Sequence, residues 1–129
     1  MPRTHLDVAA SFAVPASVAW QLLVDTRTWP QWGPTITAVD TDPPIITAGS
    51  TGRLRTPVGL WLPFAITTFE PGSSWSWRVL GVPATGHRVE AIADGCRVVF
   101  EVPMIAAPYA AVCRSALRRI GELLAAERP

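Results

Sequence analysis

The sequence predicts an α+β domain in which a seven-stranded antiparallel curved sheet wraps around one long C-terminal helix. Two short helices follow the first strand. Seven short segments between residues 6 and 104 are predicted to be strands, and the first and the last three alternate apolar and polar side chains with the period of two that is typical of strands. Residues 106–127 instead repeat apolar side chains every three or four positions, which predicts an amphipathic helix. Since one face of the sheet is polar, its other face must be covered, and only the last helix is long enough to cover it.

The first strand and the two short helices are predicted from the opening of the chain. Apolar side chains alternate along residues 6–14, and Pro15 ends this strand because proline is favourable in the first turn of a helix. Over residues 16–24 the apolar spacing becomes helical. A second helix is predicted at residues 28–32, before a Gly-Pro pair stops it.

Six further strands, separated by turn signals, continue the sheet. The last three alternate most clearly, and the Asp94-Gly95 pair between two of them predicts a tight hairpin. His87 shares a strand face with Val89 and lies opposite Arg88, so we expect its side chain to face the interior. The six predicted strands are residues 36–40, 50–56, 60–70, 75–80, 85–93 and 97–104.

A cavity is expected between the sheet and the C-terminal helix. A helix over residues 106–127 would span roughly 33 Å, and a strongly bent sheet cannot contact such a rod along its whole length. The gap between them predicts an apolar cavity of the kind that binds small molecules. The six tryptophans of this short chain support the prediction, because large flat rings can line a cavity without filling it.

Composition bounds the architecture and excludes several classes of function. A chain of 129 residues with 49% apolar residues is expected to form one folded domain over residues 1–129. Its formal charge of +1 provides no field that would attract nucleic acid. The absence of lysine excludes Schiff-base and P-loop chemistry. No run of residues resembles a membrane span or a secretory leader, so we expect a cytoplasmic protein.

Metal, cofactor and disulfide chemistry are not expected either. Only His5 and His87 are present, so a zinc site would have to borrow carboxylates or cysteines. Cys96 and Cys113 are 17 residues apart and show no paired spacing, which favours two free buried thiols over a disulfide. No pair of carboxylates is predicted to converge on the cavity, so a two-carboxylate mechanism is unsupported.

The order of the elements, together with two sequence motifs, carries a family resemblance. Residues 13–23 (AVPASVAWQLL), which lead to residues 29–34 (WPQWGP), resemble the SRPBCC or START-like superfamily, and so do residues 71–79 and the strand that follows them. Within it, the chain is most similar to the small bacterial polyketide cyclase/dehydrase-type branch. The resemblance covers nearly the whole chain and implies a helix-grip fold (START/Bet v 1-like) with a ligand cavity under the C-terminal helix. It implies no catalytic residue, because the superfamily includes lipid carriers, hormone receptors, aromatase/cyclases and chaperone-associated modules.

His87 and Tyr109 are the two candidates for chemistry. An imidazole that faces the cavity, with a pKa near neutrality, could transfer protons; it could equally hydrogen-bond a ligand or serve the core alone. The hydroxyl of Tyr109 could orient a ligand carbonyl or satisfy a buried backbone carbonyl. The residues predicted to bind the ligand are Leu54, Trp61, Trp77, His87, Val89, Phe100, Val102, Tyr109, Cys113 and Leu117.

Two features of the middle strands stay open at this stage. Arg53 and Arg55 share one strand face, where they are either solvated or recognise an acidic head group. Residues 60–69 are apolar on both faces, which leaves the orientation of Trp61 undecided. Such a strand suits a lid, a dimer contact or the mouth of a pocket.

Three functions follow as hypotheses. The first is a protein that binds an apolar small molecule, lipid-like or polyketide-like, in the cavity. The second is a cyclase or dehydratase-type enzyme that uses the same cavity, with His87 as general acid/base and Tyr109 holding an oxyanion or carbonyl. The third is an interaction module whose strand over residues 60–69 pairs with a partner. The expected partner is a hydrophobic small molecule, without nucleic acid or a membrane span, and the chain is expected to be a monomer or a homodimer.

Overall fold

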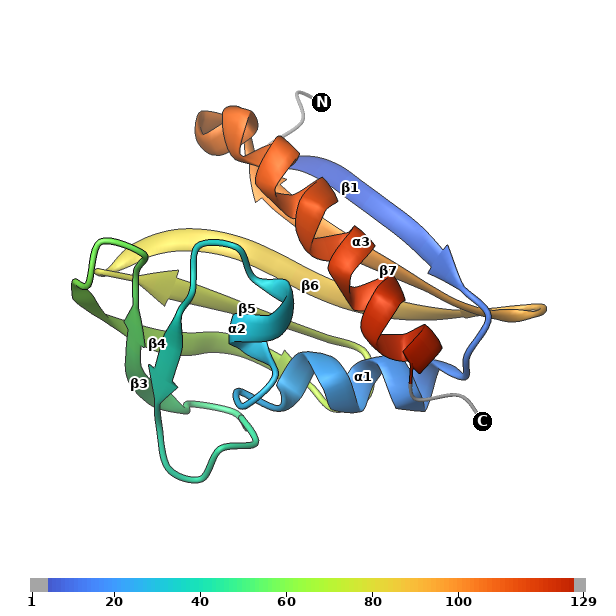
Figure 1. Cartoon of the computed structure of the whole chain (residues 1–129), viewed down its shortest axis with the longest axis horizontal. Helices are drawn as coiled ribbons and strands as arrows, with labels where there is room; N and C mark the ends of the chain where they lie inside the picture. The colour runs from blue at the N-terminus through green and yellow to red at the C-terminus, as the bar shows by residue number, and fades with distance from the viewer. Residues whose placement is uncertain (1–4, 127–129) are drawn as a thin grey trace.

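The computed structural model describes residues 5–126 and confirms the predicted fold class. Seven strands form one antiparallel sheet in the order β1-β7-β6-β5-β4-β3-β2 (Figure 1). The strands are β1 (His5–Phe12), β2 (Ala38–Asp40), β3 (Thr51–Arg55), β4 (Trp61–Glu70), β5 (Ser74–Val79), β6 (Val82–Ile92) and β7 (Gly95–Pro103). The helices are α1 (Ala16–Val24), α2 (Trp29–Trp32), the 3-10 helix η1 (Met104–Tyr109) and α3 (Ala110–Ala126).

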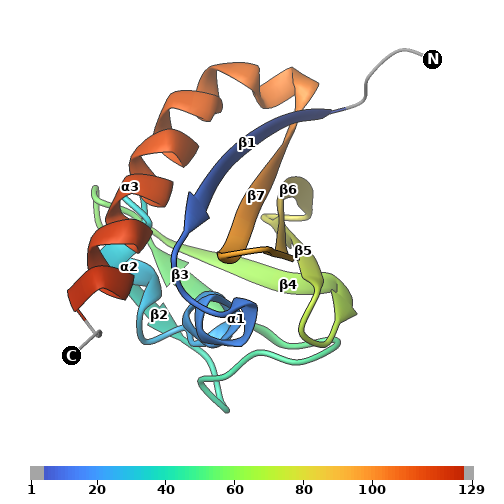
Figure 2. The same ribbon diagram turned by 90° about the vertical axis from the view of Figure 1, so that its right-hand side faces the viewer.

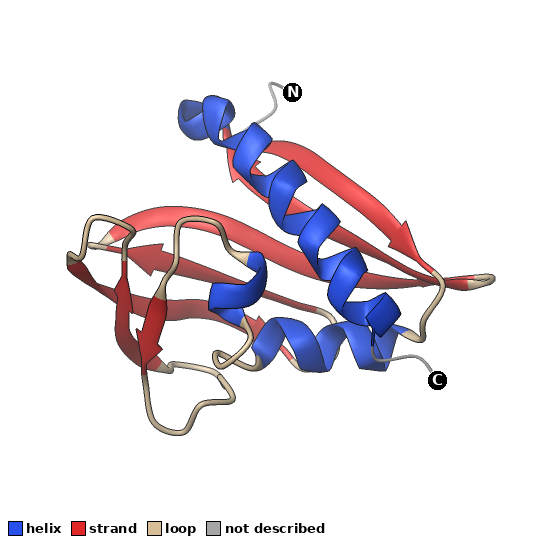
Figure 3. Cartoon of the chain, in the orientation of Figure 1, coloured by secondary structure: helices blue, strands red, loops and turns tan. Residues whose placement is uncertain are grey.

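The helices lie on one face of the sheet, as the need to bury an apolar face requires (Figure 3). A quarter turn of the molecule shows the sheet bending, so that β1 and β7 stand steeply above β3 and β4 while α3 runs along the concave side (Figure 2). Val98 and Val102 of β7 and Ile120 of α3 are fully buried in the core between these layers. None of the helices between residues 5 and 126 is long and apolar enough to cross a membrane.

The C-terminal helix is shorter than the apolar spacing predicts. It begins at Ala110 rather than at residue 106, and its 17 described residues span about 25 Å. The predicted end at Glu127 lies outside the described residues. Residues Met104–Tyr109 form η1 instead and include Pro108, which lacks a backbone N–H and clashes with a preceding α-helical turn. The prediction was wrong here because apolar periodicity does not register a proline.

Strand β6 is longer than predicted, because its hairpin with β5 is tighter than expected. It begins at Val82 rather than at residue 85, directly after a two-residue turn formed by Leu80 and Gly81. Both turn residues have positive φ, 55° for Leu80 and 74° for Gly81, as a type I′ hairpin turn requires. The extension aligns β6 with β5 up to the end of the sheet, where Val79 pairs with Val82 and both line an apolar cavity.

Candidate functional site

An apolar cavity of about 310 Å³ lies between the sheet and the chain segment that precedes α3; we call it the outer chamber. Sheet strands β3 to β6 supply most of its walls, and the α2–β2 loop, the start of the β3–β4 turn, the end of β7 and η1 supply the rest. Among the described residues 5–126, no charged side chain lines it. The lining residues are Thr35, Ile36, Leu54, Thr56, Leu62, Trp77, Val79, Val82, Pro83, Ala84, Thr85, Pro103, Ala106 and Tyr109. The resemblance implies a cavity beneath the C-terminal helix. The outer chamber instead lies beside the start of that helix, and no α3 residue in the described part of the chain lines it.

Exposed apolar side chains gather on the three segments next to the outer chamber. The β3–β4 turn, the β5–β6 turn and η1 all lie at the same end of the sheet. The exposed side chains on them are Val58, Leu60, Leu80, Val82 and Met104, each between 47% and 81% exposed. Since Val82 also lines the chamber, the cavity reaches the molecular surface through an apolar rim.

A second, smaller pocket of about 40 Å³ lies deeper in the molecule, under α3; we call it the inner pocket. Residues Thr35, Ile36, Trp77, Thr85 and Tyr109 line both cavities, so the two are neighbours separated by a shared wall. The remaining inner-pocket residues are Trp29, Trp32, Gly33, Pro34, Trp75, His87, Phe100, Val112, Cys113 and Ala116. The helix that was expected to cover the ligand cavity thus covers the inner pocket.

An aromatic cluster forms the sheet side of the inner pocket. The imidazole of His87 stacks on Trp75 with ring centroids 3.9 Å apart. It packs edge-to-face with Phe100, with ring centroids 4.8 Å apart. Trp29 of α2 stacks on Trp75 at 5.3 Å. Strand alternation explains the convergence, because residues on one face of neighbouring antiparallel strands lie side by side: Trp75 pairs with His87, and His87 with Phe100.

The hydroxyl of Thr85 links two rings of this cluster. The indole Nε1–H of Trp77 donates to Thr85 Oγ1 over 3.1 Å, and Thr85 Oγ1 lies 2.9 Å from His87 Nε2. Two further ring nitrogens, Trp75 Nε1 and His87 Nδ1, are buried without a hydrogen-bond partner in the described part of the chain. Buried polar groups are nearly always paired, so these two unpaired nitrogens on stacked rings distinguish this pocket from the rest of the core.

Burial keeps the His87 imidazole neutral. The side chain is 3% exposed, and this burial lowers its pKa from 6.5 to about 3 because a low-dielectric site disfavours the imidazolium. The backbone of Trp75 acts in the opposite direction and raises the pKa, but burial outweighs it; the distance and angle of that contact do not make it a hydrogen bond with Nδ1. The expected pKa near neutrality is therefore wrong. The alternation along the strand predicted that His87 faces the interior, but it could not predict how completely the side chain is buried.

Tyr109 stands at the boundary between the two cavities. Its hydroxyl lies 2.7 Å from Thr35 Oγ1, which joins η1 to the loop between α2 and β2. The side chain is 38% exposed, and partial burial raises its pKa above the usual value of 10. The hydroxyl is therefore protonated at neutral pH, and it bridges the shared wall rather than a backbone carbonyl.

Cys113 lines the inner pocket as a thiol. Burial raises its pKa to about 11, so the reactive thiolate is scarce at neutral pH. Cys96 is also buried, with a raised pKa, and both cysteines are free. The two free buried thiols that the cysteine spacing favours are confirmed, and neither has the environment of a nucleophile.

The structure distributes the predicted ligand-binding residues over four surroundings. Leu54 lines the outer chamber; His87, Phe100 and Cys113 line the inner pocket; and Trp77 and Tyr109 line both. Three others, Val89, Val102 and Leu117, are buried but line neither cavity. Trp61 lies on the opposite face of the sheet, 41% exposed, with the guanidinium of Arg53 4.9 Å from its ring centroid.

Sequence reasoning missed most walls of the outer chamber. Thr85 is the most informative omission, because it lies two residues before His87 and so shares its strand face. That spacing could have identified it. Thr35 comes from the α2–β2 loop, and Ala106 has non-helical backbone angles inside η1, so neither strand nor helix periodicity predicts how they are oriented. Arg53 and Arg55 line neither cavity.

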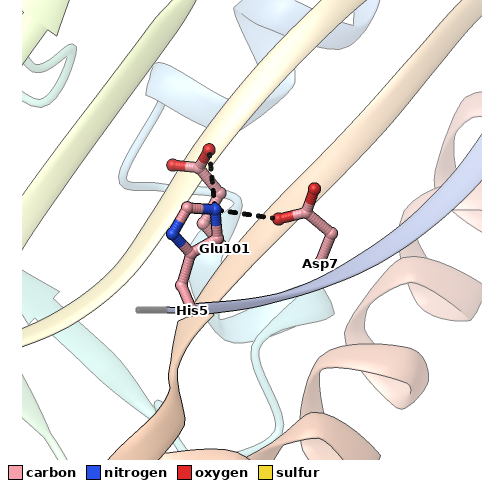
Figure 4. A group of neighbouring side chains, drawn as sticks. All are labelled: His5, Asp7 and Glu101. Carbon is pink, nitrogen blue, oxygen red and sulfur yellow. Dashed lines mark ion pairs between the residues drawn. The ribbon is translucent and has the colours of Figure 1, made fainter. Parts of the chain in front are cut away.

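The outer face of the sheet carries the charged groups. His5 Nε2 lies 3.3 Å from Asp7 Oδ1 and 3.8 Å from Glu101 Oε2 (Figure 4). These three side chains could together approach a metal ion. However, Arg88 binds the same carboxylates, at 2.6 Å from Glu101 and 3.4 Å from Asp7. The guanidinium already provides the positive charge there, and any metal would have to compete with it for the oxygens.

A more open hollow of about 410 Å³ adjoins this charged cluster. Its walls include the polar or charged side chains of His5, Thr68, Arg78 and Glu101. A ligand there would keep much of its contact with water. The apolar outer chamber is therefore the stronger candidate site for an apolar ligand.

Comparisons with known proteins agree with this architecture. The model of the family described as "Polyketide cyclase / dehydrase and lipid transport" matches residues 3–125. The uncharacterized protein Rv2574 of Mycobacterium tuberculosis is 31% identical over 97 residues, which cover 68% of this chain and 58% of that protein. The uncharacterized protein Mb2604 of Mycobacterium bovis matches to the same extent. The chain thus spans less than two thirds of the length of these relatives.

Solved structures share the fold at low sequence identity. The protein MLL2253 from Mesorhizobium loti superposes with a TM-score of 0.78 at 11% identity, over 97% of this chain and 99% of that one. DynU16, described as a putative protein in the dynemicin biosynthetic locus, superposes with a TM-score of 0.73 at 19% identity. That match covers 99% of this chain but 49% of DynU16. At such identities the likeness shows the fold alone.

Proposed function

Because this chain belongs to the polyketide cyclase / dehydrase and lipid transport family, we propose that it binds an apolar small molecule in the outer chamber. The observation that carries the proposal is the cavity of about 310 Å³ with uncharged, largely apolar walls. Burial of apolar ligand surface there would contribute about 25 cal/mol per Å², before the costs of association are subtracted.

The size of the chamber favours a compact ligand. Pockets for small molecules usually measure about 300–1,000 Å³, and this one lies at the small end of that range. Flat walls such as the Trp77 ring suit a fused-ring molecule better than a long flexible chain. The proposed ligand is therefore a small polycyclic compound, of the size of two or three fused rings.

Native mass spectrometry of freshly purified protein tests the proposal. We expect a co-purified small molecule that leaves the protein when the complex is activated in the gas phase. The variant Ala106→Trp, which fills the chamber from η1, should lose that molecule, while Ala111→Trp on the exposed side of α3 should keep it. Apo protein in every preparation, with equal spectra for both variants, would count against the proposal.

An enzymatic cyclase or dehydratase is the alternative, and one observation favours it: His87 and Tyr109 line the same inner pocket. The low pKa of His87 weakens it, because a base with a pKa of about 3 accepts a proton poorly at pH 7. His87→Ala distinguishes the two functions. In a binding protein the affinity changes modestly, whereas in an enzyme turnover disappears while binding persists. The cytoplasmic location and the monomeric or dimeric state that the sequence predicts remain part of the proposal.

A further inference from the structure

We propose that the inner pocket recognises an uncharged carbonyl oxygen of the ligand, which accepts hydrogen bonds from Trp75 Nε1 and His87 Nδ1. The inference rests on the proposed function and deepens it, because it names the chemical class of the buried end of the ligand. The apolar body of the molecule would occupy the outer chamber, and its carbonyl group would reach past the shared wall.

Two buried nitrogens without partners carry this inference. Trp75 is 1% exposed and His87 is 3% exposed, yet neither Trp75 Nε1 nor His87 Nδ1 has a hydrogen-bond partner in the described part of the chain. Both residues line the inner pocket, and their rings stack at 3.9 Å. The indole of Trp77 lines the same pocket and is paired, with Thr85, so the absence of a partner is not common to every ring nitrogen there.

The hydrogen-bond pattern fits a His87 imidazole that is protonated on Nδ1. Thr85 Oγ1 already accepts the indole proton of Trp77, and the hydroxyl can donate its own proton to His87 Nε2. A neutral imidazole that accepts at Nε2 carries its single proton on Nδ1. The indole Nε1 of Trp75 is a donor under all conditions. Both unpaired groups are therefore donors, and the missing group is an acceptor.

The surroundings select a neutral acceptor over an anionic one. No arginine between residues 5 and 126 lines the inner pocket or the outer chamber, and burial keeps His87 uncharged. A carboxylate there would lose its hydration without gaining a positive partner, which is costly. A ketone, aldehyde, ester or quinone oxygen meets the two donors without that cost. The pocket volume of about 40 Å³ has room for such an atom or for one to a few water molecules.

Three naphthalene probes of matched shape test the inference by titration calorimetry at pH 7. These are 2-acetylnaphthalene, which has the carbonyl; 2-isopropenylnaphthalene, in which a CH₂ replaces the oxygen; and 2-naphthoate, which is anionic. We expect the ketone to bind about 10-fold or more tightly than either of the other two, because only the ketone satisfies both donors without burying a charge.

The variant Trp75→Phe removes one donor and keeps an aromatic ring in the cluster. We expect it to reduce the preference for the ketone over the alkene by roughly threefold or more. Trp20→Phe is the matched control, since it is the same substitution at a residue that lines neither cavity. It should leave the affinities for both probes, and their ratio, near those of the unmodified chain.

A nuclear magnetic resonance measurement on the unmodified chain covers the case in which Trp75→Phe fails to fold. The ketone, but not the alkene, should shift the indole Nε1–H signal of Trp75. Equal affinities for ketone and alkene, or an unmoved Trp75 signal, would overturn the inference alone and indicate that the pocket retains water. Binding of none of the probes would count against the proposed function as well.

Discussion

The two faces of the sheet place the same residue types in opposite surroundings. On the inner face, His87 is buried among aromatic rings with an uncharged hydroxyl as its partner. On the outer face, His5 lies beside Asp7 and Glu101, and Arg88 joins the same carboxylates. His87 and Arg88 are consecutive residues of β6, so alternation along one strand separates an uncharged pocket from a charged cluster. The face, and not the residue type, decides what a titratable group can do here.

The largest expected effect on stability is the loss of core packing on the inner side of the sheet. Trp29→Ala should lower the free energy of unfolding by about 3–5 kcal/mol, because the fully buried ring stacks on Trp75 and donates to the Leu23 carbonyl over 2.9 Å. Urea unfolding measures this. Val58→Ala, at an 81% exposed position, should change stability by less than about 0.5 kcal/mol. Similar losses in both variants would contradict the assignment of the core.

The next effect is the loss of the Thr85 hydroxyl. Thr85→Val should cost about 3 kcal/mol, since it leaves His87 Nε2 and Trp77 Nε1 unpaired in a buried site. Thr67→Val, on an exposed position of β4, is the control and should be nearly neutral. If thermal and urea unfolding give the same stability for the two valine variants, Thr85 does not hold the two rings.

The titration of His87 should give a smaller, pH-dependent effect. Its pKa is about 3 when folded and about 6.5 when unfolded, so between these values the unfolded chain binds a proton that the folded chain does not. Stability should therefore decrease as the pH falls below about 6.5, by about 2 kcal/mol at pH 5.

His87→Gln removes this titration, so its unfolding free energy should vary less between pH 7 and 5. Asp25, whose pKa Arg27 holds below the usual value, loses its contribution only at more acidic pH and does not interfere. Parallel pH profiles for the variant and the unmodified chain would show that the imidazole is not buried as described.

The smallest expected effect is on the outer face. Arg88→Ala should cost about 1 kcal/mol, because its ion pairs with Asp7, Glu90 and Glu101 are partly exposed to solvent. The cost should shrink at 1 M salt, which screens the remaining repulsion between the carboxylates. Arg119→Ala on α3 is the control. A loss that is large and independent of salt would place Arg88 in a packing role instead.

The fold was predictable because apolar and polar side chains alternate clearly in the strands that have one solvent-exposed face. His87 was assigned to the inner face by this alternation and is buried there. The strand over residues 60–69 lacks this contrast, so the orientation of Trp61 could not be settled. The break at Pro108 was visible in the sequence but outweighed by apolar spacing that continued through it.

The site was less predictable than the fold, because strand phase gives a face and not a position along it. Val89 and His87 share a face, yet only His87 lines a pocket. Thr35 and Tyr109 are 74 residues apart, and their contact depends on how η1 turns toward the α2–β2 loop. The missing partners of Trp75 and His87 depend on the full surroundings of each nitrogen, which no local pattern contains.

The pairing of β1 with β7 has a consequence for how this chain is made. Every other neighbouring pair in the sheet is consecutive along the chain, so each can form as soon as its second strand leaves the ribosome. Strand β1 pairs only with Gly95–Pro103, and its inward side chains, Val8 among them, stay uncovered until that segment has been synthesised. We therefore expect the sheet to close last at its N-terminal edge, where a nascent chain is most open to chaperone binding.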